Sequence, residues 1–316
     1  MPQLDLERTR TFDSQRSEPT SPELQVWQDM RIGRHFRIVK HLASGGMGHV
    51  FLCRHTTLHV PAAVKVVPFD ASPQVSERIL AEAELLASLD HPHIVRALEV
   101  GSLDDESPYL LMEFIPGSDL SKPVDSGRTL PVQQTLRVLD QAACALDYLH
   151  ERGIVHRDVK PQNLLLDASA NSAVKLIDFG IAVRTGGNTF DFARALAGTP
   201  GYMAPEQAAG APCSPAVDLY AFGALALELL TGKPPRAASS RFLAAGSESF
   251  DRPLYAHGRG RDAAALDAVF TRALAREPEA RFRSASDLVW ELRRALTPSR
   301  LQPQAAATFA DYAALA

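Results

Sequence analysis

Hydrophobic residues in the first third of the chain fall in short, β-branched runs separated by Gly, Pro or polar residues. This pattern is typical of strands, and it predicts five of them at residues 36–42, 50–53, 62–67, 94–100 and 109–114. Between the third and fourth runs, apolar residues recur at three- and four-residue steps from Val75 to Leu89, which predicts one main helix. We expect Pro92 to end that helix, because proline forbids its continuation.

The remainder of the chain has mainly the helical period. Residues 133–150 are amphipathic, whereas residues 214–230 are more uniformly apolar and predict a helix at the centre of a core. Two further helices are expected at 263–275 and 286–296, and two short strands at 163–166 and 174–177. The fold class that this order indicates is α+β, with a small β-rich part followed by a larger, mostly helical part.

Composition and charge indicate which kinds of partner and which cellular location to expect for this chain. The 316 residues are 46% hydrophobic and 22% charged, as in ordinary globular proteins, and the net charge of -4 comes without a long basic run, so no nucleic-acid partner is expected. No apolar stretch reaches the ~18 residues of a membrane span, and none is expected. The three cysteines are far apart, which favours small buried residues in a reducing compartment and a cytoplasmic location.

A glycine-rich turn lies between the first two predicted strands. Gly45, Gly46 and Gly48 would let a hairpin backbone lie directly on phosphate oxygens, because glycine has no Cβ and its φ is free. Glycine-rich hairpins are common, so this turn carries little weight alone.

Lys65 stands in the apolar third strand, where burial is costly without a counter-ion or a phosphate. A lysine at the surface edge of a sheet is the plain alternative. The following helix offers Glu82 and Glu84, which point to different faces. Glu82 lies on the face of Ile79 and Leu86, so we expect it to be the partner of Lys65.

Residues 156–163 read His-Arg-Asp-Val-Lys-Pro-Gln-Asn, and Asp178-Phe179-Gly180 follows at the end of the strand at 174–177. An acid at the end of a buried strand with glycine next to it provides a hard oxygen ligand and backbone room for a metal ion.

In their order along the chain, these segments resemble the motifs of bacterial, eukaryotic-like (Hanks-type) serine/threonine protein kinases, across about residues 36–296. The resemblance implies a bilobal protein-kinase fold with a five-stranded antiparallel N-lobe and a mostly helical C-lobe. It implies transfer of the γ-phosphate of Mg-ATP, or Mn²⁺ in place of Mg²⁺, to Ser/Thr hydroxyls of protein substrates. We expect the kinase domain at residues 34–297, with the N-lobe at 34–112, the hinge at 113–120 and the C-lobe at 121–297. A mobile arm is expected before it at 1–33, and a loose tail after it at 298–316.

Catalytic and metal-binding roles follow from the resemblance. It implies that Asp158 orients the substrate hydroxyl and accepts its proton, and that Lys160 steadies the moving phosphate. It also implies that Lys65, paired with Glu82, holds the α- and β-phosphates, and that the Mg²⁺ ligands are Asn163 and Asp178. The ATP-binding residues that it implies are Leu42, Gly45, Gly46, Gly48, Val50, Ala63, Lys65, Met112, Glu113, Ile115, Asp119 and Leu165.

The resemblance also implies regulation. Arg157 precedes Asp158, a pattern linked to control by a phosphorylated activation loop, and we expect autophosphorylation at Thr185 or Thr189. A transient homodimer for this autophosphorylation is compatible with the family. Thr199 is expected to shape the substrate groove. Three further residues are expected to be structural: Glu206, Asp218 and Arg281.

The sequence departs from the kinase pattern at one position, and two other functions are alternatives to an active protein kinase. Ala43 replaces the first glycine of the phosphate loop, for which we expect a modest effect on ATP binding. A pseudokinase, which is a binding scaffold without turnover, would be favoured by loss of a chemical residue, but all four of Lys65, Asp158, Asn163 and Asp178 are present. A small-molecule phosphotransferase is disfavoured by residues 198–206, which resemble a platform for an extended peptide.

Overall fold

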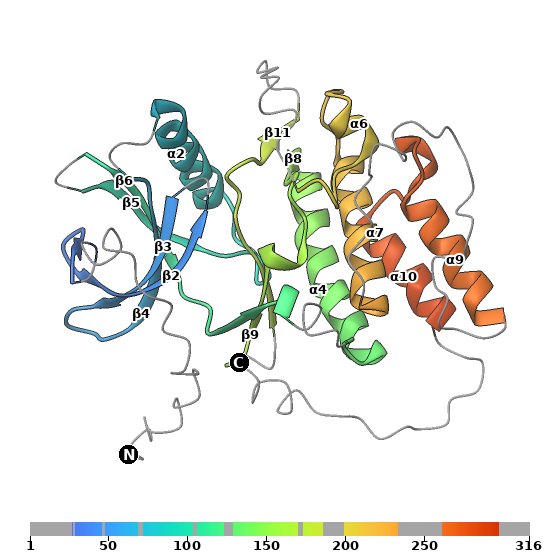
Figure 1. Ribbon diagram of the computed structural model, residues 1–316, viewed down its shortest axis with the longest axis horizontal. Helices are drawn as coiled ribbons and strands as arrows, with labels where there is room; N and C mark the ends of the chain where they lie inside the picture. Colours follow the sequence, from blue (N-terminus) through green and yellow to red (C-terminus); the bar gives the residue numbers. More distant parts are fainter. Residues whose placement is uncertain are drawn as a thin grey trace, which may run out of the picture.

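The chain folds into two lobes in a computed structural model (Figure 1). A sheet with one long helix forms the first lobe, and a group of helices forms the second. The residues that the structure describes are 27, 29–45, 48–68, 72–103, 106–122, 129–169, 173–185, 199–232 and 261–296.

The sheet of the first lobe has six antiparallel strands in the order β1-β2-β3-β4-β6-β5. These strands are β1 (Arg31–Ile32), β2 (Phe36–Gly45), β3 (Gly48–His55), β4 (Pro61–Val66), β5 (Ala97–Ser102) and β6 (Pro108–Glu113). The five predicted strands are confirmed, and β1 is an additional short strand within the segment that we expected to be a mobile arm. Ile32 explains this difference, because its side chain is buried on the outer face of the sheet, in a cluster that includes Ile38 and Phe51.

Helix α2 (Pro73–Ala87) packs its apolar stripe against β5 and β6 and buries Ile79, Ala83 and Leu86. It ends five residues before Pro92, so the expectation that this proline ends the helix is wrong. The side chain of Ser88 donates a hydrogen bond of 2.7 Å to the carbonyl of Leu85, which closes the last turn.

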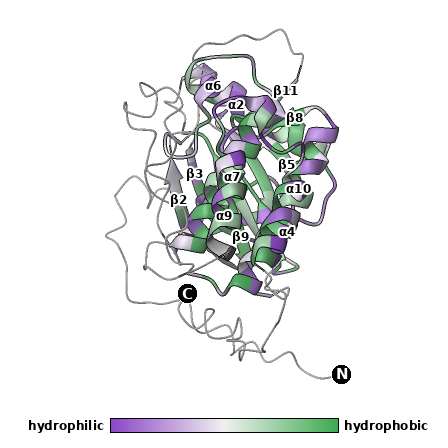
Figure 2. Cartoon of the chain, turned by 90° about the vertical axis from the view of Figure 1, so that its right-hand side faces the viewer, coloured by the Kyte–Doolittle hydropathy of each residue, from purple (hydrophilic) through white to green (hydrophobic). Residues whose placement is uncertain are grey.

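The second lobe is built from α4 (Val132–Glu151), α6 (Pro205–Ala208), α7 (Pro215–Thr231), α9 (Arg261–Ala273) and α10 (Ala285–Leu296), with 3-10 turns η2 (Pro161–Asn163) and η3 (Pro278–Ala280). As its composition predicted, α7 is buried along most of its length, and it packs on α4, α9 and α10. Gly232 ends α7 in the left-handed conformation with φ +68°, which suits glycine. Figure 2 shows α4, α9 and α10 with both hydrophobic and hydrophilic residues.

Two small sheets connect the helices to the functional residues. One sheet has the order β10-β9-β7, from β7 (Gly117–Asp119), β9 (Leu164–Asp167) and β10 (Ala173–Leu176). The other pairs β8 (Ile154–Val155) with β11 (Val183–Arg184). Both are antiparallel, and they hold the segments between residues 154 and 185 against the helical core.

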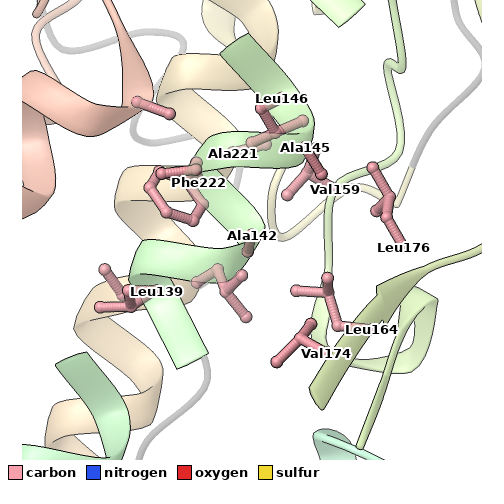
Figure 3. Packing of buried hydrophobic residues seen from close by; sticks show 14 of the residues in the cluster. Leu139, Ala142, Ala145, Leu146, Val159, Leu164, Val174, Leu176, Ala221 and Phe222 are labelled. Carbon is pink, nitrogen blue, oxygen red and sulfur yellow. The ribbon is translucent and has the colours of Figure 1, made fainter. Parts of the chain in front are cut away.

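The core beneath these sheets fixes the position of residues 156–164. Side chains of α4, including Ala142, lie between Phe222 of α7 on one side and Val159 and Leu164 on the other (Figure 3). All of these side chains are buried, so the loop that carries Asp158 rests on a packed surface.

The three cysteines are free. Cys53 is buried and Cys213 is half-buried, and burial raises the pKa of each thiol to about 12. Cys144 is exposed on α4, so the expectation of burial is wrong for this residue. In the described part of the chain, no helix is long and apolar enough to cross a membrane.

Candidate active site

The glycine-rich turn joins β2 to β3, and Gly45 pairs with Gly48 at its end. Gly48 has φ +118°, and a Cβ at this position would lie 2.2 Å from the carbonyl oxygen of Val66. No side chain fits there, so β3 and β4 can run this close together only because residue 48 is glycine. Gly46, the third glycine that we expected to contact ATP, lies outside the described residues.

Lys65 of β4, Glu82 of α2 and Asp178 after β10 meet in one cluster. The Nζ of Lys65 donates to Glu82 Oε2 at 2.7 Å and to Asp178 Oδ1 at 3.0 Å. Glu82 Oε1 accepts a hydrogen bond of 3.1 Å from the backbone N–H of Phe179. The pairing of Lys65 with Glu82, predicted from helical spacing, is therefore present, and one lysine joins three elements of the two lobes.

Burial and charge act in opposite directions on this cluster. Burial alone would lower the pKa of Lys65, but the carboxylates of Glu82 and Asp178 outweigh it, so the pKa is raised and the ammonium stays charged. Burial raises the pKa of Glu82 against the opposing effect of Lys65. The pKa of Asp178 is lowered, because the ammonium of Lys65 outweighs the effect of burial.

The carboxylate of Asp158 is the centre of a second cluster. Its Oδ2 accepts hydrogen bonds from Lys160 Nζ at 2.6 Å and from Asn163 Nδ2 at 3.0 Å. Its Oδ1 accepts hydrogen bonds from the hydroxyl and the backbone N–H of Thr199, at 2.9 and 3.1 Å. Lys160 also donates to Thr199 Oγ1 at 2.8 Å. The structure thus brings together a candidate base, a cation and a hydroxyl from segments about forty residues apart.

Asn163 and Asp178 offer oxygen atoms that suit Mg²⁺. Asn163 donates its amide nitrogen to Asp158, which leaves the amide oxygen as the atom for a ligand. The N–H of Ile177, the residue before Asp178, donates to the Asn163 carbonyl at 2.9 Å, and this bond joins the two segments. The side chain of Asp178 is 41% exposed, so an ion has access to it. Carboxylate and amide oxygens with room for water fit this metal.

Asp178 and Arg157 both have a strained backbone. Their φ angles are +63° and +72°, in the left-handed region that non-glycine residues seldom adopt. Such strain is concentrated at functional sites, where surrounding contacts hold it in place. Arg157 is held by its N–H, which donates to Asp218, and by its carbonyl, which accepts from Gln207.

Several of the predicted ATP-binding residues lie on the sheet near the end of β6. Met112 pairs with Ala63 across β4 and β6, and Val50 pairs with Lys65 across β3 and β4, so these strands bring four of the predicted residues together. Ile115 is buried and Leu42 is exposed. Glu113 uses its N–H for a hydrogen bond to the Arg96 carbonyl, so its own carbonyl oxygen is the backbone atom that it could offer to ATP.

Asp119 and Leu165 pair across β7 and β9, on the second lobe. One oxygen of Asp119 accepts hydrogen bonds from the backbone and the side chain of Ser121. Its second oxygen is the atom that would serve the predicted contact with ATP.

The structural residues brace the catalytic loop. Asp218 is fully buried, and it accepts hydrogen bonds from the N–H groups of His156 and Arg157 and from His150. These donors outweigh the effect of burial and lower the pKa of Asp218. Arg281 binds Glu206 with two hydrogen bonds of 2.5 and 2.7 Å. This two-point geometry is the strongest form of an arginine–carboxylate pair.

Thr185 follows β11 and is exposed. Its N–H and its hydroxyl donate to the carbonyl of Gly153, at 2.6 and 3.1 Å. Thr189 lies outside the described residues.

Sequence reasoning missed a role for His156. Its ring meets that of Phe179 edge to face at a centroid distance of 4.9 Å, and its Nε2 lies 3.2 Å from the Ile177 carbonyl. The ring therefore links the loop of Asp158 to the loop of Asp178. Its place in the motif, two residues before Asp158, was the signal that could have indicated this contact.

Comparison with known proteins places this geometry in a family context. The family described as the protein kinase domain matches residues 36–253. The chain is 36% identical over 254 residues to serine/threonine-protein kinase PknB of Mycobacterium leprae, covering 78% of this chain and 40% of that protein. It is 36% identical over 266 residues to the probable serine/threonine-protein kinase SCO3848 of Streptomyces coelicolor, covering 82% and 39%.

A more distant relative is serine/threonine-protein kinase PrkC of Bacillus subtilis, at 30% identity over 274 residues, covering 86% of this chain and 42% of the relative. The chain thus spans about two fifths of the length of the curated relatives that it matches.

Proposed function

Because the chain belongs to the protein kinase domain family, we propose that it is a serine/threonine kinase that transfers the γ-phosphate of ATP to protein hydroxyls. The observation that carries this proposal is the carboxylate of Asp158 with Lys160, Asn163 and Thr199 bound to it at 2.6–3.1 Å. A substrate hydroxyl that reaches this carboxylate would be oriented by it and would give up its proton to it.

Lys65 supports the same function from the other lobe. Its ammonium is held by Glu82 and charged, which suits it to bind the α- and β-phosphates. Lys160, whose ammonium lies 2.6 Å from Asp158, would neutralise charge on the moving phosphoryl group. The hairpin with Gly45 and Gly48 would cover the phosphates with backbone N–H groups.

A divalent ion, when bound, would neutralise the phosphates, and Asn163 and Asp178 would hold it. Mg²⁺ is our choice among divalent ions, with Mn²⁺ as the substitute, because both ligands are hard oxygens. We also predict that the substrates are proteins, that the chain forms a transient homodimer for autophosphorylation, and that it is located in the cytoplasm.

The test is incubation of the purified chain with γ-labelled ATP and Mg²⁺, with a generic protein substrate, beside the variant Asp158→Asn. We expect label on Ser or Thr with the parent chain alone. The asparagine keeps the shape of the side chain but cannot accept the proton. Label with neither chain, although ATP binds, would contradict the proposal and favour a binding scaffold. Label on a small-molecule acceptor alone would indicate a different phosphotransferase.

A further inference from the structure

The outer face of the phosphate-binding hairpin carries a hydrogen-bonded chain of three side chains. His41 Nε2 lies 2.8 Å from Ser44 Oγ, and Ser44 Oγ lies 2.8 Å from His49 Nδ1. His41 belongs to β2, His49 follows Gly48 on β3, and Ser44 precedes Gly45. The chain therefore ties the two strands together at the glycines expected to cover the phosphates.

A bulge in β2 makes this chain possible. His41 pairs with Phe51, Ala43 pairs with Val50 and Ser44 pairs with His49, and the register shifts between His41 and Ala43. Residues three apart in a regular strand point to opposite faces. The shift brings His41 and Ser44 to the face of His49 and Phe51.

Trp27 covers this face from a segment that precedes the sheet. Its ring centroid lies 5.7 Å from that of Phe51 and 6.5 Å from that of His49. Trp27 packs, with Met30, on the buried cluster of the outer face, which includes Ile38 and Phe51. The ring therefore contacts the first residue after Gly48 while it is anchored on the sheet.

Backbone hydrogen bonds fix this segment to β2. The N–H of Asp29 donates to the Ile38 carbonyl at 3.2 Å, and the N–H of Ile38 donates to the Met30 carbonyl at 2.9 Å. Two residues later, Arg31 and Ile32 pair with β2 as strand β1. Trp27 is thus held near the hairpin by the main chain as well as by its ring.

The hairpin depends on such outer contacts because glycine gives it few of its own. A Cβ at Gly45 would have no heavy atom of a non-neighbouring residue within 4 Å, so nothing packs against this residue in the direction of a side chain. Glycine also costs more conformational entropy to fix than any other residue. Contacts at His49 and Ser44 therefore help to restrict the backbone beside Gly45 and Gly48.

We propose that Trp27 and the chain of His41, Ser44 and His49 position the phosphate-binding hairpin, so that a segment before the predicted kinase domain sets part of the affinity for ATP. The inference rests on the proposed function, which makes this hairpin the phosphate site. These are positioning residues, because Val50, the predicted ATP contact between His49 and Phe51, points to the opposite face of β3.

The test compares the parent chain with Trp27→Ala and Ser44→Ala, and with Met30→Ala as the matched control. Met30 lies in the same segment and packs on the same cluster, but its carbonyl is bonded to Ile38, far along β2 from the glycines. For each chain, the Kd of Mg-ATP is measured by calorimetry, KM and kcat by phosphate transfer, and Tm by thermal unfolding.

We expect Kd and KM for ATP to rise roughly two- to tenfold in Trp27→Ala and Ser44→Ala, the size of one aromatic contact or one hydrogen bond. The value of kcat should stay at that of the parent, since the hairpin binds ATP and the transition state alike. Trp27→Phe should restore most of the affinity. Met30→Ala should lower Tm without a change in Kd.

Parent values of Kd and KM in both folded variants would overturn the inference. An equal rise in Met30→Ala would also overturn it, because the effect would then come from stability of the sheet. A parent chain that binds ATP but transfers no phosphate would contradict the proposed function alone, since Kd still tests the positioning. A parent chain that does not bind ATP would overturn both.

Discussion

The ammonium of Lys65 lies 2.7 Å from the carboxylate of Glu82, and both side chains are at least nine-tenths buried. The two residues come from β4 and α2, so this ion pair fixes the helix against the sheet. Protein kinases need this pair in place for phosphate transfer. The proposed kinase activity would therefore depend on the position of α2, and the pair can be tested directly.

Glu82→Gln should lower kcat/KM roughly 10- to 100-fold, which corresponds to the loss of one hydrogen bond to a charged group. Glutamine keeps the volume and can still accept from Phe179, so the chain should fold. The matched control is Glu84→Gln, two residues away on the exposed face of α2, and it should behave as the parent. Steady-state kinetics and thermal unfolding check both variants. Equal losses in the two variants would contradict a specific role for Glu82.

Asp178→Asn should abolish metal-dependent phosphate transfer while the fold remains. Asparagine is the apt replacement because it tolerates the φ of +63° at this residue and can still accept from Lys65. It removes the charge that a divalent ion requires. Turnover across a Mg²⁺ titration and far-UV circular dichroism measure the two effects. A folded variant with the parent rate would show that the metal ligands lie elsewhere.

The local elements were predictable because each depends on residues close together in sequence. The period of residues 133–150 defines α4, and the uniformly apolar run at 214–230 defines α7, within two residues at each end. Lys65 and Glu82 could be paired from two local facts: a charge in an apolar strand, and a helical face shared with Ile79 and Leu86.

Features that depend on packing between distant segments were not predictable. Helix α2 ends at Ala87, where the backbone N–H and the side chain of Ser88 both donate to Leu85, whereas Pro92 was the visible signal in the sequence. The bulge in β2 decides which residues share a face, and no residue pattern marks it, so His41, Ser44 and His49 were not linked to each other or to Trp27. The contact of His156 with Phe179 likewise depends on the meeting of two loops.

Thr185→Ala with Thr189→Ala should lower both the phosphate content of the chain and its kcat/KM. A phosphate in this loop would offer acceptor oxygens to arginines and order the loop. At Thr185 it would also replace the hydroxyl that now donates to Gly153, so the end of β11 would have to rearrange. Phosphosite mapping by mass spectrometry and kinetics of the parent and the variant check this.

The control for this prediction is the pair Thr185→Ser with Thr189→Ser, which keeps both hydroxyls and should keep phosphate and activity. Unchanged activity together with unchanged phosphate content in the alanine variant would remove the activation loop from the regulation of this chain.

Asp218→Asn should destabilise the chain at neutral pH by about 1.5–3 kcal/mol, because a buried carboxylate that accepts from three donors loses its charge. The pKa of Asp218 is lowered in the folded chain. Its stabilisation is therefore fully present above the ordinary pKa of aspartate, roughly 4, and is lost as the pH falls through the lower folded-state pKa.

The difference in Tm between the parent and Asp218→Asn should accordingly be largest near neutral pH and shrink below about pH 4. Asp140→Asn is the matched control on the same lobe, because its carboxylate pairs with Arg293 at the surface and is 44% exposed. Surface pairs contribute little, so that variant should unfold close to the parent at every pH. A difference in Tm for Asp218→Asn that does not change with pH would show that the carboxylate acts through its shape rather than its charge.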